Sequence, residues 1–238
     1  MDKRKPSLKM KYKQTKTILI KDIRSELRQF NDLISIFLFG IISIFIFSSS
    51  YNLVTGNQFM SLELFVIQIW FIIFFIMMFI MTKLFLKEQE AGTLDGLLTS
   101  PLSSNVIILS KILFCFIILC FVEFFMLVFA FFISVPLIQN FNIILFIVLG
   151  IIFPTLNLSI CGTIMSAFSI YTKNKSLILP ILFLPIILPI INPIISINIK
   201  LLDGAGFFDV IFEFLFLIFH FLLTSSILML ISDSIFSN

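Results

Sequence analysis

Long runs of apolar residues, rich in Phe, Ile and Leu, alternate along this chain with short polar segments. A helix needs about 20 apolar residues to cross the ~30 Å hydrocarbon core of a bilayer. Six stretches meet that requirement, approximately residues 33–50, 62–81, 106–135, 143–170, 177–197 and 210–231. The pattern therefore predicts an all-α polytopic membrane protein with six transmembrane helices.

Composition excludes a soluble protein, because hydrophobic residues make up 60% of the 238 positions and charged residues only 12%. A soluble domain of this size has too little interior to bury so much apolar surface. The first partner that the sequence predicts is therefore the lipid bilayer. The net charge of +3 reflects membrane topology and indicates no nucleic-acid partner.

The N-terminal region is polar and basic. We expect residues 1–15, which carry many Lys and few apolar side chains, to form a disordered tail near anionic lipid. Residues 16–31 can form a helix that lies in the membrane interface before the first span. One side of this helix would carry Leu19, Ile23, Leu27 and Phe30, and the other Lys21, Arg24 and Arg28. Residues 16–238 would then form a single transmembrane domain.

The distribution of Lys and Arg predicts the orientation. Ten of the 16 basic residues precede the first span. Five others lie between spans two and three, at the start of span three, or between spans four and five, and only Lys200 falls in a loop on the opposite side. By the positive-inside rule, both termini and the polar segment between spans two and three are cytoplasmic.

That polar segment, residues 87–101, is the candidate partner-binding site. Its glycine provides a permissive joint, the threonine after it can cap a short helix, and an aspartate suits the first turn of that helix. Three leucines at i, i+3 and i+4 spacing give the helix one apolar face. The residues concerned are Glu88, Glu90, Gly92, Thr93, Leu94, Asp95, Leu97 and Leu98. The segment is either a short cytoplasmic coupling helix that binds a soluble partner or an ordinary loop helix resting on the membrane surface.

Two ionisable residues lie well inside the predicted spans. Glu123, in span three, is costly enough in lipid to be a functional candidate. The alternative is that it is protonated, or hydrogen-bonded to a neighbouring helix such as the one that carries Asn157. His220 lies in span six. A single buried histidine is more often a hydrogen-bonded packing residue than an axial haem ligand. The cysteines show no metal-ligand spacing, and the sequence predicts neither a catalytic nor a metal site.

Span five contains four prolines, at positions 180, 185, 189 and 193. Each proline removes a backbone donor, so we expect a helix that is kinked or broken toward its outer end. Carbonyls freed in this way need partners inside a membrane. This favours a re-entrant turn, closed by the loop of residues 198–209, over a straight crossing.

The order of these segments resembles a known family. An interfacial KDIRSELR helix and two spans are followed by FLKEQEAGTLDGLLTSPLS, which runs into ILSKIL, and then by CGTIMSAFSIYTKNKSLILPILFLPIILPI. This arrangement resembles CcmB, the haem exporter protein B family of ABC transporter permeases, over residues 21–232. Lys173 and Lys175 stand where arginines are more usual in that family.

The resemblance implies a permease subunit of the cytochrome c maturation system, in a bacterial inner or plasma membrane or an organellar inner membrane. The implied partners are a CcmA-like ATPase subunit, a CcmC-like haem-handling subunit and a CcmE-like haem chaperone, and the resemblance is compatible with a homodimer. The chain has no phosphate loop of the GxxxxGKS or GxxxxGKT kind, so we expect ATP hydrolysis in a separate subunit and no enzyme activity here.

We expect this chain to bind no cofactor, with haem at most a substrate that the complex handles. An alternative function remains. The same architecture would suit the permease of an ABC exporter for another substrate, such as a drug or a lipid.

Overall fold

The computed structural model describes residues 8–28, 30–56, 59–85, 88, 92–93, 96, 99, 102–134, 142–168 and 175–236. The described part of the chain is helical and contains no strand. Six of its helical segments are long and apolar enough to cross a membrane. These spans are Asn31–Thr55, Leu62–Lys83, Ser104–Ser134, Ile143–Phe168, Leu179–Leu202 and Phe207–Leu230. The prediction of an all-α membrane protein with six spans is confirmed.

The helices follow one another in the predicted order. The first three spans are formed by α2 (Phe30–Thr55), α3 (Leu62–Lys83) and α6 (Ser104–Ser134). Span four is made of α7 (Ile143–Leu145), the π-helix η1 (Phe146–Ile152) and α8 (Phe153–Phe168). Span five is α9 (Lys175–Leu202), and span six is η3 (Phe207–Val210) followed by α10 (Ile211–Phe236). An additional helix, α1 (Leu8–Arg28), precedes them.

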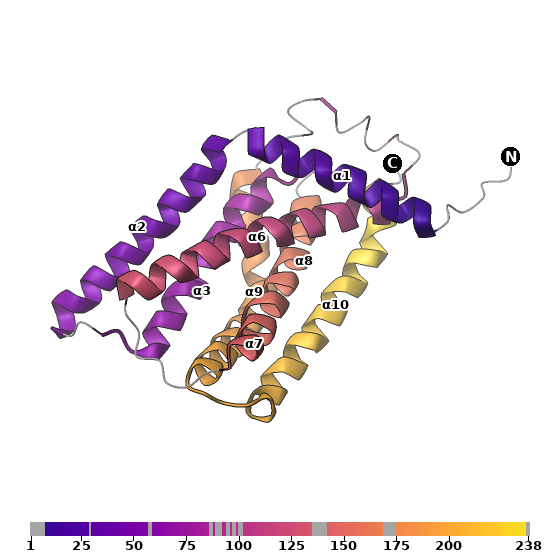
Figure 1. Ribbon diagram of the computed structural model, residues 1–238. Coiled ribbons are helices and arrows are strands. Elements are labelled where there is room, and N and C mark those ends of the chain that lie inside the picture. Colours follow the sequence, from indigo (N-terminus) through magenta and orange to yellow (C-terminus); the bar gives the residue numbers. More distant parts are fainter. Residues whose placement is uncertain are drawn as a thin grey trace, which may run out of the picture.

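Helix α6 is the central element of the bundle, because it contacts α1, α2, α3, α8 and α10. Helix α3 packs against α9 and α8 as well as α6, and its Trp70 is among the largest fully buried side chains. In contrast, α2 and α10 leave much of their apolar surface exposed. Such surfaces are suited to contact with lipid. Figure 1 shows α1 lying across one end of the bundle, which we call the α1 end.

Helix α1 is longer than the sequence suggested, since it begins at Leu8 rather than near Lys16. It also buries a partly different side, because Leu19 and Ile23 of the expected apolar side pack against the core only in part. Thr15, Ile18, Asp22 and Glu26 are buried, whereas Leu27 of the expected apolar side is exposed. The reason is that α1 packs along α6, so the side that it buries is determined by its partner helix.

Span five is a continuous helix, and the predicted re-entrant turn is wrong. All four prolines lie inside α9, which ends at Leu202. One side of α9 is fully packed, with Ile187, Ile190, Ile194 and Ile197 at most 1% exposed. This packing stabilises the helix despite the missing proline donors. The chain turns only afterwards, where Gly204 adopts a φ of 92° that favours glycine.

Candidate functional site

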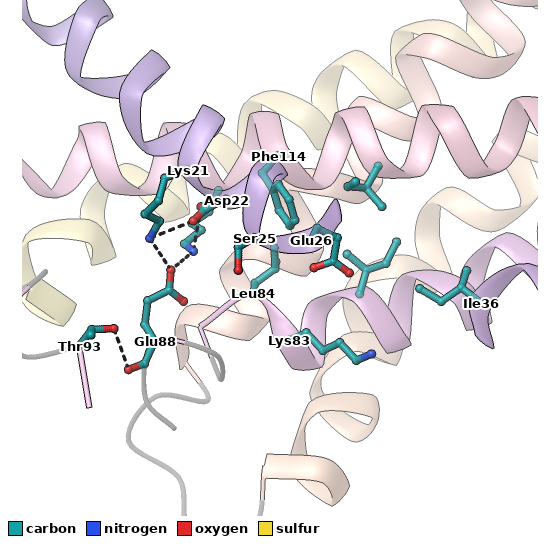
Figure 2. A pocket seen from close by; sticks show the side chains of 13 residues that line it. Lys21, Asp22, Ser25, Glu26, Ile36, Lys83, Leu84, Glu88, Thr93 and Phe114 are labelled. Carbon is teal, nitrogen blue, oxygen red and sulfur yellow. Dashed lines mark hydrogen bonds and ion pairs between the residues drawn. The ribbon is translucent and has the colours of Figure 1, made fainter. Parts of the chain in front are cut away.

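A cluster of four charged side chains lies at the α1 end of the bundle, and we call it the ion-pair cluster. Lys21 and Asp22 come from α1, Lys111 comes from α6, and Glu88 lies in the segment between α3 and α6. The Nζ atom of Lys111 is 2.6 Å from Oε1 of Glu88 and 3.0 Å from Oδ2 of Asp22. The Nζ atom of Lys21 is 3.1 Å from the same Glu88 oxygen and 3.0 Å from Oδ1 of Asp22. Figure 2 shows Lys21 directed toward Glu88 and Asp22.

Lys111 is the centre of this cluster because it is almost completely buried. It lies about two turns into α6, and its side chain is 3% exposed. A buried ammonium is strongly disfavoured unless it is paired. The carboxylates of Asp22 and Glu88 supply the pairing, and the ring of Phe85 lies 5.4 Å from its Nζ atom, where a cation–π contact adds to it.

The cluster shifts the pKa values of Glu88 and Lys21. Burial alone would raise the pKa of Glu88, but the positive charges and hydrogen bonds of Lys111 and Lys21 outweigh it and hold the pKa below its ordinary value. Burial alone would lower the pKa of Lys21, and the carboxylates of Asp22 and Glu88 raise it above its ordinary value. The cluster is therefore held together by ionised groups.

Glu88 also connects the cluster to the predicted partner-binding segment. Its carbonyl oxygen accepts hydrogen bonds from the backbone N–H of Thr93 at 2.9 Å and from the Thr93 hydroxyl at 3.3 Å. Gly92 has a φ of 64°, which permits the chain to turn there. The turn that ends at Thr93 is thus connected through Glu88 to a buried ion pair.

The described residues of the predicted partner-binding segment differ in their exposure. Glu88 points inward and is 7% exposed, whereas Gly92 and Thr93 are exposed. The remaining candidates of this segment lie outside the described residues, so their partner-binding role stays a prediction. They are Glu90, Leu94, Asp95, Leu97 and Leu98.

A cavity of about 210 Å³ adjoins the ion-pair cluster. Its polar wall contains the cluster itself together with Ser25 and Glu26 of α1. Its apolar wall is formed by residues of three spans, among them Ile36 of α2, Ile80 of α3 and Phe114 of α6. The cavity is therefore polar toward α1 and apolar toward the interior of the bundle (Figure 2).

Glu123 lies apart from the cluster, farther along α6, and is 1% exposed. Its Oε2 atom is hydrogen-bonded to the hydroxyl of Thr155 on α8. This is the helix that carries Asn157, so the bond named in the packing alternative is present, and a functional role of Glu123 stays a prediction. The same hydroxyl also lies 2.8 Å from the carbonyl oxygen of Ile151. No basic residue in the described part of the chain pairs with Glu123.

His220 is a hydrogen-bonded packing residue, as the sequence indicated. Its Nδ1 atom is 3.0 Å from Oδ1 of Asn157, and its Nε2 atom is 3.1 Å from the carbonyl oxygen of Ile186. Asn157 in turn donates to the carbonyl of Leu217 at 3.0 Å. Both ring nitrogens therefore face oxygen atoms of the protein, in an arrangement that links α8, α9 and α10.

Sequence reasoning did not assemble the ion-pair cluster. Lys111 enters the prediction only through the charge count and the ILSKIL match, Lys21 only as part of the basic side of the N-terminal helix, and Asp22 only within KDIRSELR. One signal was present, since Asp22 and Glu26 are one helical turn apart and a lysine lies well inside an apolar helix. Paired acids on an amphipathic helix and a buried lysine elsewhere together favour an ion pair.

No curated protein and no solved structure matches this chain. The family model described as CcmB protein, in contrast, matches residues 13–231. This range includes the ion-pair cluster and all six spans. The chain therefore belongs to the CcmB family, the membrane permease subunits of the haem-export ABC system for cytochrome c maturation.

Proposed function

We propose that this chain couples ATP hydrolysis by a partner ATPase to movement of its own membrane helices during haem export and release of the haem chaperone. The observation that carries the proposal is the ion-pair cluster. It joins Glu88, in the segment between α3 and α6, to α1 and to the central helix α6. A partner that moves this segment would therefore move two helices with it.

The coupling follows from the contacts of each element. Displacement of the segment would pull on Glu88, and separating its carboxylate from Lys111 would cost each buried group one of its ion-pair partners. Lys111 is fixed in α6, and α6 contacts α2, α3, α8 and α10. The ion pairs would thus transmit a push from outside the bilayer to most of the spans.

The charge distribution supports an orientation with the α1 end in the cytoplasm. The basic residues of α1 lie toward this end, and so does Lys83 at the end of α3. Lys200, at the end of α9, lies toward the opposite end of the bundle. The positive-inside rule then places the ATPase-facing segment on the cytoplasmic side, where ATP is available.

The proposed complex contains a CcmA-like ATPase, a CcmC-like haem-handling subunit and a CcmE-like haem chaperone, with a second copy of this chain as a further partner. ATP hydrolysis takes place in the ATPase subunit. Haem is the handled substrate, and His220 is poorly placed to hold it, because both of its ring nitrogens already face protein oxygens.

The proposal is tested by co-purification with the ATPase. Replacing Leu97 and Leu98 together by Ser should remove a helix-in-groove anchor, since each buried Leu contributes roughly 1.5–3 kcal/mol. A loss of a few kcal/mol is enough to dissociate a micromolar complex. The matched control replaces Leu53 and Val54 by Ser, because both are highly exposed at the opposite end of α2.

We expect the Leu97 and Leu98 variant to insert normally and lose the ATPase, and the control to keep it. An intact complex in both would mean that this segment only rests on the membrane. Export of a drug or lipid is the second candidate function. Normal cytochrome c assembly in cells lacking this chain would favour that candidate.

A further inference from the structure

One oxygen of Glu88 has no hydrogen-bond partner among the residues that the structure describes. Its Oε1 atom accepts from Lys21 and Lys111, whereas no donor in the described part of the chain reaches the buried Oε2 atom. Figure 2 shows this second oxygen directed away from Lys21 and toward the side of the cavity where Ser25 and Leu84 lie. A buried carboxylate oxygen without a donor is costly, so the cavity favours a ligand that brings one.

The cavity also has the two-sided character of an interfacial site. Its apolar wall includes Ile36, Ile80 and Ile118, which belong to three different spans. Ile36 lies about 9 Å along α2 from its first residue, at the helical rise of 1.5 Å per residue. The polar wall lies across the ends of these spans, where α1 crosses the bundle. A ligand with a polar head and an apolar tail matches this arrangement.

Charges of both signs line the polar wall. The acceptor is Glu88, and Lys83 lies at the same cavity with its side chain 32% exposed. Lys83 pairs with Asp32 at 2.9 Å. A partly exposed pair of this kind is weak, and an ammonium has three donors, so Lys83 can bind a further acceptor. The site therefore suits a zwitterion, with its ammonium on Glu88 and its anion toward Lys83.

We propose that this cavity binds the headgroup of an ethanolamine phospholipid. The primary ammonium donates to Oε2 of Glu88, the phosphate lies toward Lys83, and the start of an acyl chain contacts the apolar wall. The site does not depend on the ATPase coupling, because it requires only that the chain spans a membrane.

Ethanolamine is favoured over choline by simple chemistry. A primary ammonium has three N–H donors, whereas the quaternary ammonium of choline has none and cannot satisfy the Glu88 oxygen. A basic side chain of a partner protein could supply a donor, but it would leave the apolar wall uncovered. An anionic lipid such as phosphatidylglycerol would bring a phosphate to Lys83 but only neutral hydroxyl donors to Glu88, which are weaker partners for a carboxylate than an ammonium.

The test is lipid retention by the purified full chain in native mass spectrometry. The protein is delipidated in detergent and given an equal mixture of dioleoyl phosphatidylethanolamine and dioleoyl phosphatidylcholine. We expect the wild type to retain the ethanolamine lipid on the order of tenfold more strongly, the ratio that one charge-assisted hydrogen bond gives. Equal retention of the two lipids overturns the proposal.

A cavity-filling variant locates the site without disturbing the ion pairs. Ser25→Phe places a ring at the cavity wall and should abolish the preference for ethanolamine. The matched control is Ser35→Phe, the same change at an exposed position of α2, which should keep the preference. Glu88→Gln, which exchanges the charged acceptor for an amide, should weaken the preference as well.

Each result decides the assignment. A preference that survives Ser25→Phe, or that is lost equally in Ser35→Phe, places the lipid elsewhere and overturns the proposal. If Ser25→Phe keeps the preference and loses the ATPase, the cavity accepts a side chain of that partner instead.

Discussion

Lys111 and Glu88 form a buried ion pair, with 2.6 Å between Nζ and Oε1, although they come from different parts of the chain. Lys111 belongs to a transmembrane helix, and Glu88 to the polar segment that precedes it. Asp22 of α1 joins the same ammonium at 3.0 Å. Lys111 therefore joins α1 and the turn at Thr93 to the central helix of the bundle.

Removal of that charge should destabilise the protein strongly. Lys111→Met leaves the buried carboxylates of Asp22 and Glu88 with only the more exposed Lys21 as a partner, which costs about 3–5 kcal/mol. We expect a large fall of the unfolding temperature in detergent, measured by intrinsic fluorescence or calorimetry.

The control for this variant is Lys200→Met. Lys200 also lies 2.6 Å from a carboxylate, that of Glu213, but its side chain is 41% exposed. An exposed pair of this kind contributes only about 0–1 kcal/mol. Similar losses in the two variants would show that the burial of Lys111 does not matter.

The stability of the fold should depend on pH through Glu88. Its pKa is lower in the folded protein than the ordinary value of about 4.3. A lowered carboxyl pKa stabilises the fold above the ordinary value, and this contribution is lost as the pH falls through the folded value. We therefore expect the unfolding temperature to decline below about pH 4.3.

The variant that isolates this dependence is Glu88→Gln. It should be less stable than the wild type at neutral pH and should decline less steeply in acid. Glu63→Gln, at an exposed position in the first turn of α3, should retain the wild-type decline. A Glu88→Gln profile parallel to the wild type would exclude Glu88 as the source.

The six spans could be predicted from the sequence because each is determined by its own run of apolar residues. Span five shows where such local reasoning ends. A proline at 185, 189 or 193 predicts a break when the helix is considered alone. In the folded protein, the buried side that includes Ile190 packs against other spans, and α9 continues to Leu202.

The candidate site was only partly predictable for a related reason. The sequence indicated that the segment around Glu88 is important, and it treated that residue as part of an exposed surface. The burial of Glu88 depends on Lys111 and on Asp22, which lie 23 and 66 positions away along the chain. No local pattern connects these three positions, so only the packing of α1 on α6 brings them together.

Gly162 should tolerate no side chain without a rearrangement of Met77. A Cβ atom at Gly162 would collide with Cε of Met77, which is completely buried. Gly162→Ala should therefore cost about 1 kcal/mol, at the low end for overpacking, because the colliding atom is the end of a flexible side chain. Gly96→Ala, with open space around the added atom, should change stability by less than about 0.5 kcal/mol.

The cause can be checked with a double variant. Met77→Ala removes the colliding atom, so the effect of Gly162→Ala should be much smaller in its presence. The measurement is the unfolding temperature of the two single variants and the double variant. Additive effects would show that the two residues do not compete for the same space.

Glu123 offers the last prediction, because its carboxyl can act in function or only in packing. It is buried in α6 and bonded to Thr155, whose hydroxyl has one hydrogen but also contacts the carbonyl of Ile151. Both bonds can form together only if the carboxyl itself carries a proton. Glu123→Gln provides a neutral group of the same shape with N–H donors, so it should keep the packing of α6 on α8.

Function and packing are separated by comparing three variants in cells. If the carboxyl acts in function, Glu123→Ala and Glu123→Gln should both abolish cytochrome c assembly while membrane abundance stays normal. If it only packs, Glu123→Gln should assemble cytochrome c normally. Thr155→Val should then lower the unfolding temperature, because it leaves a buried polar group unpaired at a cost of about 1–3 kcal/mol. Normal assembly and normal stability in all three variants would exclude both roles. We do not expect that outcome, because a buried carboxyl with neither role has nothing to offset its cost in the membrane.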